Sequence, residues 1–127
     1  MTYEEFNDFC RALPATSYVV QWGSSHVWKV GGKVFAIGGW GEADKPAFTF
    51  KTSEHNYYYL EEQPGYKPAP YLASRGMKWI QQYDVPESED DELKFYLQES
   101  HRIVSLGLTK KKQKELGLNQ DPQQKSN

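Results

Sequence analysis

The sequence has one cysteine, Cys10, among its 127 residues. A single cysteine excludes an internal disulfide and a metal cluster built on cysteines, so we interpret Cys10 as a buried structural thiol. Long apolar runs are also absent, because no window reaches the roughly 18 apolar residues that a membrane-spanning helix needs. The first residues, Met-Thr-Tyr-Glu-Glu-Phe, are acidic and polar, unlike a signal peptide. We therefore expect a cytoplasmic protein without membrane contact.

Catalytic and metal-binding motifs are equally scarce. The three histidines, His26, His55 and His101, are scattered and form no His-Glu-x-x-His pattern. Residues 38–41, Gly-Gly-Trp-Gly, lack the Lys-Ser/Thr of a phosphate-binding loop and precede no predicted helix, so we interpret them as a flexible loop tip. Ser100 and His101 are neighbours on a predicted helix, where their side chains diverge. We expect no metal, no cofactor and no enzymatic activity.

Aromatic residues are abundant and charge is unevenly distributed. Four Trp, nine Tyr and six Phe make up 15% of the chain, and such side chains supply either core volume or stacking surfaces. Residues 84–99 contain seven acidic residues and one lysine, a local charge of −6, so the remaining chain carries +4 against a net charge of −2. If the acidic segment forms its own face, the opposite face attracts phosphates. Otherwise the acids only form the solvated start of a helix.

Four segments are predicted to be helices from their capping residues and helical spacing. They begin after Thr2, Ser53, Pro86 and Thr109 and end near Pro14, Glu62, Gly107 and Gly117. Short runs rich in Val, Phe, Trp and Tyr predict strands, namely SYVVQWG, HVWKV, KVFAIGG, AFTFK and KWIQQY. We therefore predict a single α+β domain over residues 1–118, with an antiparallel sheet of about five strands and helices packed on one face. A flexible polar tail is expected over residues 119–127.

Two segments of the predicted sheet carry specific expectations. Gly31-Gly32 is a two-residue hairpin turn, because glycine tolerates positive φ. This turn places Trp28 opposite Phe35 in the core, and Lys29 on the other side. The segment PAPYLASRGMKW follows an extended path set by its prolines. Its apolar residues Tyr71, Leu72 and Trp79 are expected to return the chain to the sheet and close the core, which leaves a basic stretch exposed.

Basic residues near aromatics are the candidate nucleic-acid contacts, because cations bind phosphates and aromatic rings stack on bases. These candidates are Lys29, Lys33, Lys51, Lys67, Arg75 and Lys78, and Lys110, Lys111, Lys112 and Lys114 form a further cluster. A role in solubility is the alternative for these lysines. A second hypothesis is an interaction module that binds a protein or a small ligand through Trp40, Tyr57 and Tyr58.

The N-terminal helix, the VWKVGGKVFAI hairpin, the PGYKPAPYLASRGMKWI segment and the DVPESEDDELKFYLQESHRIV helix occur in this order. The sequence thereby resembles the MmcQ/YjbR family from about Thr2 to about Leu116. The hairpin match rests on Gly31-Gly32 and Lys33, and the second match on Pro70, Tyr71, Leu72, Arg75 and Trp79. This resemblance implies a small bacterial protein with a fold like that of the frataxin homologue CyaY, and DNA binding through a double-wing arrangement of β-elements. With the acidic net charge, we expect weak, backbone-directed DNA binding by a monomer.

Overall fold

The computed structural model describes residues 1–41, 45–72 and 76–120 of the chain. Within these residues, six strands form one sheet in the order β1-β2-β3-β4-β6-β5, and every neighbouring pair is antiparallel. The strands are β1 (Thr16–Gln21), β2 (Ser25–Val30), β3 (Lys33–Gly38), β4 (Phe48–Lys51), β5 (Tyr66–Pro68) and β6 (Trp79–Gln82). The predicted α+β class is confirmed, with one strand more than expected: β5 lies in a proline-rich segment that was not among the predicted strands.

Four α-helices and one short 3-10 helix complete the described fold. They are α1 (Tyr3–Arg11), α2 (Glu54–Leu60), η2 (Glu87–Glu89), α3 (Asp90–Leu106) and α4 (Lys110–Glu115). The predicted capping box is present, because the Glu5 N–H donates to Thr2 Oγ1 at 3.1 Å and the Thr2 N–H donates to Glu5 Oε1 at 2.9 Å. Ser53 and Thr109 accept from the first turns of α2 and α4. Three helix starts therefore follow from local sequence.

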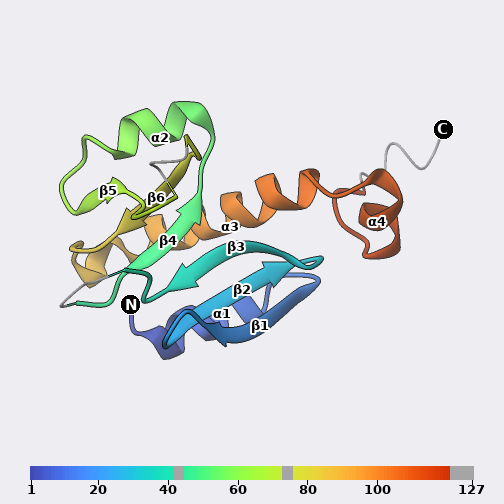
Figure 1. The fold of residues 1–127 in the computed structure, drawn as a ribbon, viewed down its shortest axis with the longest axis horizontal. Coiled ribbons are helices and arrows are strands. Elements are labelled where there is room, and N and C mark those ends of the chain that lie inside the picture. The colour runs from blue at the N-terminus through green and yellow to red at the C-terminus, as the bar shows by residue number, and fades with distance from the viewer. Residues whose placement is uncertain (42–44, 73–75, 121–127) are drawn as a thin grey trace.

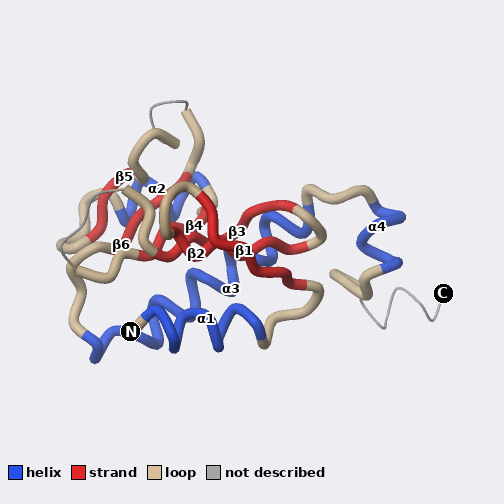
Figure 2. The backbone as a smooth tube through the Cα atoms, turned by 60° about the horizontal axis from the view of Figure 1, so that its bottom comes forward, coloured by secondary structure: helices blue, strands red, loops and turns tan. Residues whose placement is uncertain are grey.

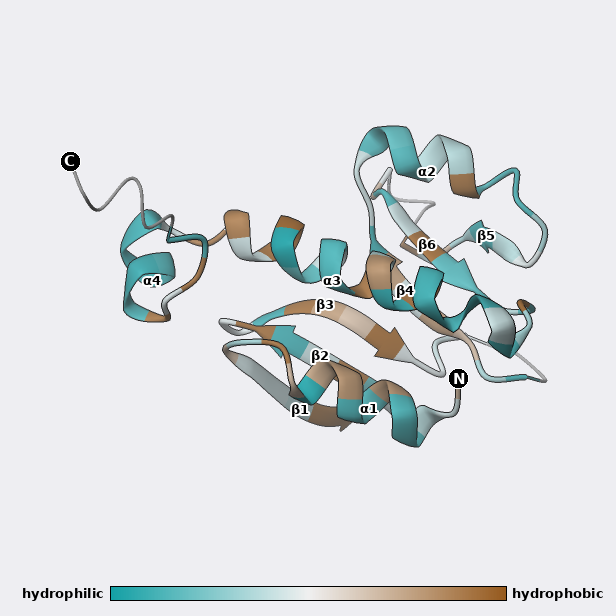
Figure 3. Ribbon diagram, turned by 180° about the vertical axis from the view of Figure 1, so that it is seen from behind, coloured by the Kyte–Doolittle hydropathy of each residue, from teal (hydrophilic) through white to brown (hydrophobic). Residues whose placement is uncertain are grey.

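Helices α1 and α3 lie on the same side of the sheet, which we call the helix face (Figure 1 and Figure 2). The core lies between these helices and the sheet, and its most buried members include Phe6, Cys10, Trp28, Phe50, Leu93 and Leu97. Figure 3 shows hydrophobic residues along β3 and alternating hydrophobic and hydrophilic turns in α1 and α3. Gly38 permits the close approach of α1, because a Cβ there would lie 2.9 Å from Cε2 of Phe6.

The β2–β3 hairpin departs from the expected register. Its turn pairs Val30 with Lys33 as predicted, but a bulge follows and Trp28 lies opposite Ala36, so the predicted pairing with Phe35 is wrong. The extra residue is accommodated by α3, where the Ser100 hydroxyl donates to the Phe35 carbonyl at 2.6 Å and accepts from the Lys51 N–H at 2.8 Å. A side chain from α3 thus replaces a ladder hydrogen bond where β3 bends away from β4. Both rings are nevertheless buried, as expected.

Two predictions about loops are corrected. Gly38, expected in a flexible loop tip, is the buried last residue of β3. Tyr71, expected to close the core, has 69% of its surface exposed. Ala69 still bonds the sheet through its N–H and the Trp79 carbonyl at 2.9 Å, and the chain then turns at Tyr71, where φ is +66°. This turn directs the chain away from the sheet, so the Tyr71 side chain does not reach the core. Trp79 is buried as expected, at 5% exposed.

The predicted tail begins at residue 119, but the first of its residues is tied to the domain. The Asn119 amide donates to Ser105 Oγ and to Gln113 Oε1, both at 3.0 Å. Residues 121–127 lie outside the described residues. Within the described part of the chain, no helix is both long and apolar enough to cross a membrane.

Candidate nucleic-acid interface

The sheet register divides the predicted lysines between two sides. Directly paired residues of antiparallel strands point to the same face, and one such row runs Val19, Val27, Ile37, Thr49, Gln81 and Lys67 across all six strands. We call the side that carries this row the outer face, because it is opposite the helix face. Lys29 and Lys51 lie two residues beyond Val27 and Thr49, so they point to the same side. Lys29, Lys51 and Lys67 therefore share the outer face.

Lys33 and Lys78 lie on the helix side and have partners within the domain. The Lys33 ammonium donates to the Gly107 carbonyl at 3.2 Å, at the C-terminal end of α3. The Lys78 ammonium donates to the Tyr58 hydroxyl at 3.2 Å and lies over the Tyr57 and Tyr58 rings. This hydrogen bond raises the pKa of Lys78 above its ordinary value. These two lysines are thus directed toward helices rather than toward the outer face.

The three outer-face lysines differ in whether their ammonium groups contact other side chains. The Lys67 ammonium lies 4.9 Å from the centre of the Tyr83 ring, a cation–π contact. Within the described residues, neither Lys29 nor Lys51 has an ion pair or a hydrogen bond from its ammonium. Both side chains are half-buried. Arg75, the remaining basic candidate, lies outside the described residues. Lys29 and Lys51 are therefore the cations on this face that are available to a ligand.

Acidic residues are excluded from the strands. The six strands contain four lysines and no aspartate or glutamate. Among the described residues, the largest group of acids lies instead in η2 and the first turn of α3, which contain Glu87, Glu89, Asp90, Asp91 and Glu92. Helix α4, with four lysines, lies beyond the other end of α3, which is about 25 Å long (Figure 1). In the part of the chain that the structure describes, the strand lysines are thus separated from the acids at the start of α3, and these acids from the lysines of α4.

The centre of the outer face is fully buried although α1 and α3 cover the other side. Val27, Ile37, Thr49 and Gln81 are all between 0 and 1% exposed, and loops lie above this side of the sheet in Figure 2. The Gln81 amide donates to the Trp40 carbonyl at 2.6 Å and to Thr49 Oγ1 at 3.1 Å. The chain that follows β3 therefore folds across the sheet and is held there by a buried glutamine.

Two polar atoms of the outer face are left without partners. They are Gln81 Oε1 and the Trp79 indole nitrogen, and they are the only buried side-chain polar atoms of this kind in the described residues. Both residues point to the outer face, since they alternate along β6 with the helix-face residue Ile80. A buried polar atom without a partner is unfavourable by about 1–3 kcal/mol. In folded proteins most buried polar atoms are bonded to protein or to ordered water.

Three aromatic side chains gather beside this buried row. Trp40 contacts Trp22 at a ring-centre distance of 4.9 Å and Tyr71 at 5.8 Å, both edge to face. The Trp40 indole N–H donates to the Pro70 carbonyl at 2.8 Å. We call Trp22, Trp40 and Tyr71 the aromatic cluster. It joins the turn between β1 and β2 to the segments that follow β3 and β5.

The aromatic cluster includes one residue of the predicted interaction surface. Trp40 was predicted, whereas Trp22 and Tyr71 were not assigned to it. Of the other two predicted members, Tyr57 is 9% exposed and belongs to the core, and Tyr58 is 50% exposed on α2. The three residues thus do not form one surface. Tyr57 packs α2 against the core on the helix side, whereas Trp40 belongs to the outer face.

Two members of the cluster have unusual backbone conformations. Trp22 has φ of +51° and Tyr71 has φ of +66°. Only Ala15 and Asn119 are further non-glycine residues with positive φ among those described. A positive φ is rare for a bulky side chain and is unfavourable by about 1–3 kcal/mol. Trp22 and Tyr71 are also exposed, at 54% and 69%, so core packing does not explain why large rings occupy these positions.

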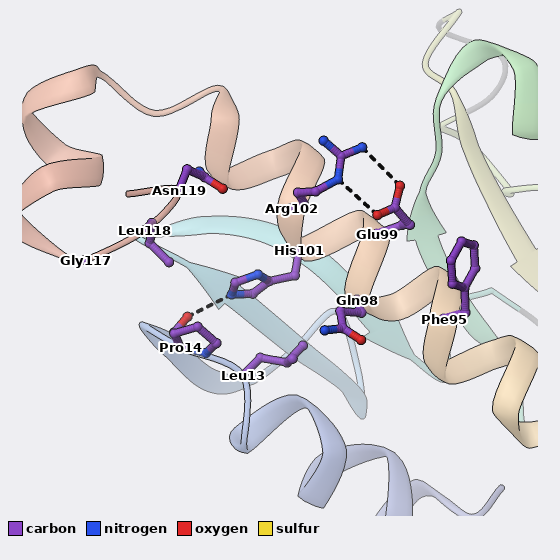
Figure 4. Close-up of a pocket in the computed structure, with 10 residues that line it drawn as sticks. All are labelled: Leu13, Pro14, Phe95, Gln98, Glu99, His101, Arg102, Gly117, Leu118 and Asn119. Atoms are coloured by element: carbon purple, nitrogen blue, oxygen red, sulfur yellow. Dashed lines mark hydrogen bonds and ion pairs between the residues drawn. The ribbon is translucent and has the colours of Figure 1, made fainter. Parts of the chain in front are cut away.

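A pocket of about 340 Å³ lies on the helix side, between α3, the turn after α1 and residues 117–119 (Figure 4). His101 lines it and donates its Nε2–H to the Pro14 carbonyl at 2.8 Å. Burial lowers the pKa of His101, so the imidazole is neutral. Arg102 forms two hydrogen bonds to Glu99, both at 3.0 Å. His101 joins α3 to the turn after α1, Arg102 and Glu99 pair within α3, and none of the three is a nucleophile activated by a base.

The remaining reactive groups are inert or dispersed. Cys10 is buried, and burial raises the pKa of its thiol, which disfavours the thiolate that nucleophilic attack and metal binding require. No group of three or more His, Cys, Asp or Glu residues within reach of one metal ion occurs in the described part of the chain. The outer face, with its lysines and aromatic cluster, is therefore the surface that a functional argument has to explain.

Comparisons with known proteins give a family and a fold. The sequence model of the YjbR family matches residues 11–103. Among solved structures, the chain is similar to the crystal structure of the Deinococcus radiodurans protein DR2400, which carries the domain DUF419, with a TM-score of 0.77 and 24% sequence identity. The match covers 92% of this chain and 88% of that one. A comparison with curated proteins finds no match.

Proposed function

The chain belongs to the YjbR family, and we propose that it is a non-enzymatic DNA-binding protein whose outer face contacts the phosphate backbone. Lys29 and Lys51 are the proposed phosphate contacts, and Lys67 assists at the edge of the sheet. Contacts to phosphates position a protein on DNA without reading its sequence. In this proposal the protein acts as a cytoplasmic monomer and needs no cofactor.

The observation that carries the proposal is the one-sided distribution of charge. Every charged residue at an outer-face strand position is a lysine, while the acidic residues of η2 and α3 belong to the helix side. Lys29 and Lys51 occupy equivalent places on β2 and β4, which are two strands apart, so their Cα atoms lie about 10 Å from each other. Two cations at this spacing, with no acid between them on the sheet, attract a polyanion despite the net charge of −2.

A second candidate is a module that binds a protein or a small ligand. Its support is the exposed pair Trp22 and Tyr71 around Trp40. Such a module gives binding that depends weakly on salt and not at all on Lys29 or Lys51. The salt dependence of binding therefore separates the two candidates.

The test measures binding of fluorescently labelled DNA, duplex and single-stranded, by anisotropy at several salt concentrations. Each phosphate contact contributes about −0.9 to the slope of log K against log salt for duplex DNA. Replacing Lys29 and Lys51 by alanine should flatten that slope by about 1.8 and weaken binding, because two contacts are lost. Affinity of the unchanged protein should lie in the non-specific range, about 1–100 μM.

The matched control is the double substitution Lys33→Ala and Lys78→Ala. It removes the same charge from the helix side, where both lysines have partners. The proposal expects this control to retain most of the slope. Equal losses in the two double variants would mean that net charge alone governs binding, and absence of binding to either form of DNA would reject the proposed function.

A further inference from the structure

We propose that the aromatic cluster of Trp22, Trp40 and Tyr71 is a stacking platform for unpaired bases, so that the outer face binds single-stranded DNA in preference to duplex. This inference rests on the proposed function, which supplies the class of ligand. It adds that the DNA is single-stranded when it is bound, and it names the residues that distinguish single-stranded from duplex DNA. Bases are accessible to stacking only where they are not already paired and stacked in a duplex.

The first support is the amount of aromatic surface that remains open. Trp22 is 54% exposed and Tyr71 is 69% exposed. Both meet Trp40 edge to face, with interplanar angles of 71° and 82°. An edge-to-face contact covers only part of a ring, so flat aromatic area is left on this surface. Flat exposed rings bind bases of any sequence, because every base has a π-face.

The second support is the conformation of the two exposed residues. A position with φ above zero in a turn favours glycine or asparagine, because a large side chain crowds the backbone there. Trp22 and Tyr71 both occupy such positions. Neither ring is buried by the fold, and the two reach the same third ring. Strain of this kind is retained where a surface has a function to perform.

The third support is that Trp40, the central ring of the cluster, is held by hydrogen bonds. Trp40 is fixed at both ends, through its indole N–H to the Pro70 carbonyl and through its own carbonyl to the Gln81 amide. Gln81 is fully buried on the outer face, and its Oε1 has no hydrogen-bond partner among the described residues. A preorganised platform loses little conformational entropy when a ligand binds.

Charge selects the occupant among those that stack on aromatic rings. Trp40 of the cluster is bonded through its carbonyl to Gln81 of the central row, and Lys29 and Lys51 occupy the next positions on the same face of β2 and β4. Lysines on the same face of the sheet as exposed rings complement a chain that has both phosphates and bases. A neutral proline-rich peptide would gain nothing from these cations, and an acidic protein surface, which they would attract, has no bases to stack on the rings. We therefore commit to a single-stranded nucleic acid, with DNA as the ligand to be tested.

The experiment compares three labelled probes of equal length by fluorescence anisotropy at one low salt concentration. They are a single-stranded oligothymidine, a mixed-sequence duplex, and an abasic oligonucleotide that retains every phosphate and lacks bases. The expected order of affinity is oligothymidine first, with the abasic strand weaker by roughly 5- to 150-fold per stacked base. Tryptophan fluorescence should be quenched by the oligothymidine and unaffected by the abasic strand.

The decisive variant is Trp22→Asn combined with Tyr71→Asn. Asparagine is favoured at positive φ, so the fold should be as stable as before or more so, which a chemical denaturation curve checks. Binding of oligothymidine should fall to the level of the abasic strand. The control Trp22→Phe combined with Tyr71→Phe keeps both rings and should retain most of the preference for bases.

The outcomes separate this inference from the proposed function. If no probe binds, the proposed function fails and this inference fails with it. If the abasic strand, the duplex and the oligothymidine bind equally well, and the asparagine variant binds like the original, backbone binding stands and the stacking platform is wrong. If the asparagine variant changes the oligomeric state measured by sedimentation, a second copy is the occupant and the inference is likewise rejected.

Discussion

The two faces of the sheet are both buried at their centres, but they are buried by different means. On the helix face, α1 and α3 supply large apolar side chains such as Phe6 and Leu97. Buried polar groups there have partners: the Gln82 amide donates to the Tyr66 hydroxyl at 3.0 Å, and that hydroxyl donates to Glu92 at 3.0 Å. Apolar packing and completed hydrogen bonds make this face a stabilising core.

The outer face is built from both apolar and polar side chains, and two of its buried polar atoms have no hydrogen-bond partner among the described residues. Its central row includes Thr49 and Gln81, and the two unpartnered buried atoms belong to Gln81 and Trp79. Its cover is provided by the chain around Trp40 rather than by a helix. The helix face therefore stabilises the fold, whereas in the proposed function the outer face presents lysines and rings. The predictions below test this division of roles.

The largest effect is expected on the helix face, for Trp28→Ala. Trp28 is 2% exposed and its indole N–H donates to Asn7 Oδ1 at 2.9 Å. Removing the ring leaves a cavity and an amide acceptor without its donor, so the free energy of unfolding should fall by about 3–5 kcal/mol. Urea denaturation followed by far-UV circular dichroism measures this. An unchanged midpoint would show that the helix face is not the stabilising one.

A smaller loss is expected at the centre of the outer face, for Gln81→Leu. The substitution removes the donor to the Trp40 carbonyl, which is unfavourable by about 1–3 kcal/mol, and also removes the unpartnered Oε1, which offsets part of that loss. The variant should therefore lose less stability than Trp28→Ala, while the emission of Trp40 shifts as its segment loosens. The matched variant Gln82→Leu on the helix face should leave Trp40 unaffected. A shift with both glutamines would contradict the separation of the faces.

Single lysines should affect stability least, and differently on the two sides. Lys33→Ala removes a cation from the C-terminal end of α3 and should lower stability by about 0.3–1 kcal/mol. Lys29→Ala removes an ammonium with no partner in the described part of the chain, so stability should stay within about 0.5 kcal/mol. Thermal unfolding of the two variants side by side makes the comparison. A larger loss for Lys29→Ala would assign that lysine a structural role.

Local sequence predicted much of the fold, and the exceptions share one cause. The helix starts at Thr2, Ser53 and Thr109 depend on residues three positions away, so they could be predicted. The bulge after Phe35 could not, because it depends on a hydroxyl at Ser100, 65 residues later. Strand β5 was missed for a similar reason, since its three residues are ordered by pairing with β6.

The sequence predicted which kinds of residue form the candidate site, namely lysines and aromatics, but it predicted less of how these residues are arranged. Strand alternation correctly separated Lys29 from Trp28, but nothing in the sequence reveals that Lys33 and Lys78 reach partners on helices. Trp22 was missed because it ends a strand run, where an aromatic residue is ordinary. The available signal was Gly23 directly after it, because a glycine at that point predicts a turn and therefore an exposed neighbour.

The smallest effect concerns pH and the helix-side pocket. Burial lowers the pKa of His101, and its Nε2–H donates to the Pro14 carbonyl. The unfolded chain then binds a proton more readily than the folded one, so the contribution of His101 to stability is fully present above the unfolded pKa of about 6.5. It is lost as pH falls through the lower folded pKa.

The replacement His101→Gln retains an N–H donor without a titrating group, so its unfolding midpoint should change less than that of the original between pH 7.5 and pH 5. The comparison is restricted to this range because carboxylates titrate below it. Parallel curves for the two proteins would mean that the imidazole is not held neutral, and a steeper decline for the glutamine variant would place the pH sensitivity elsewhere on the helix face.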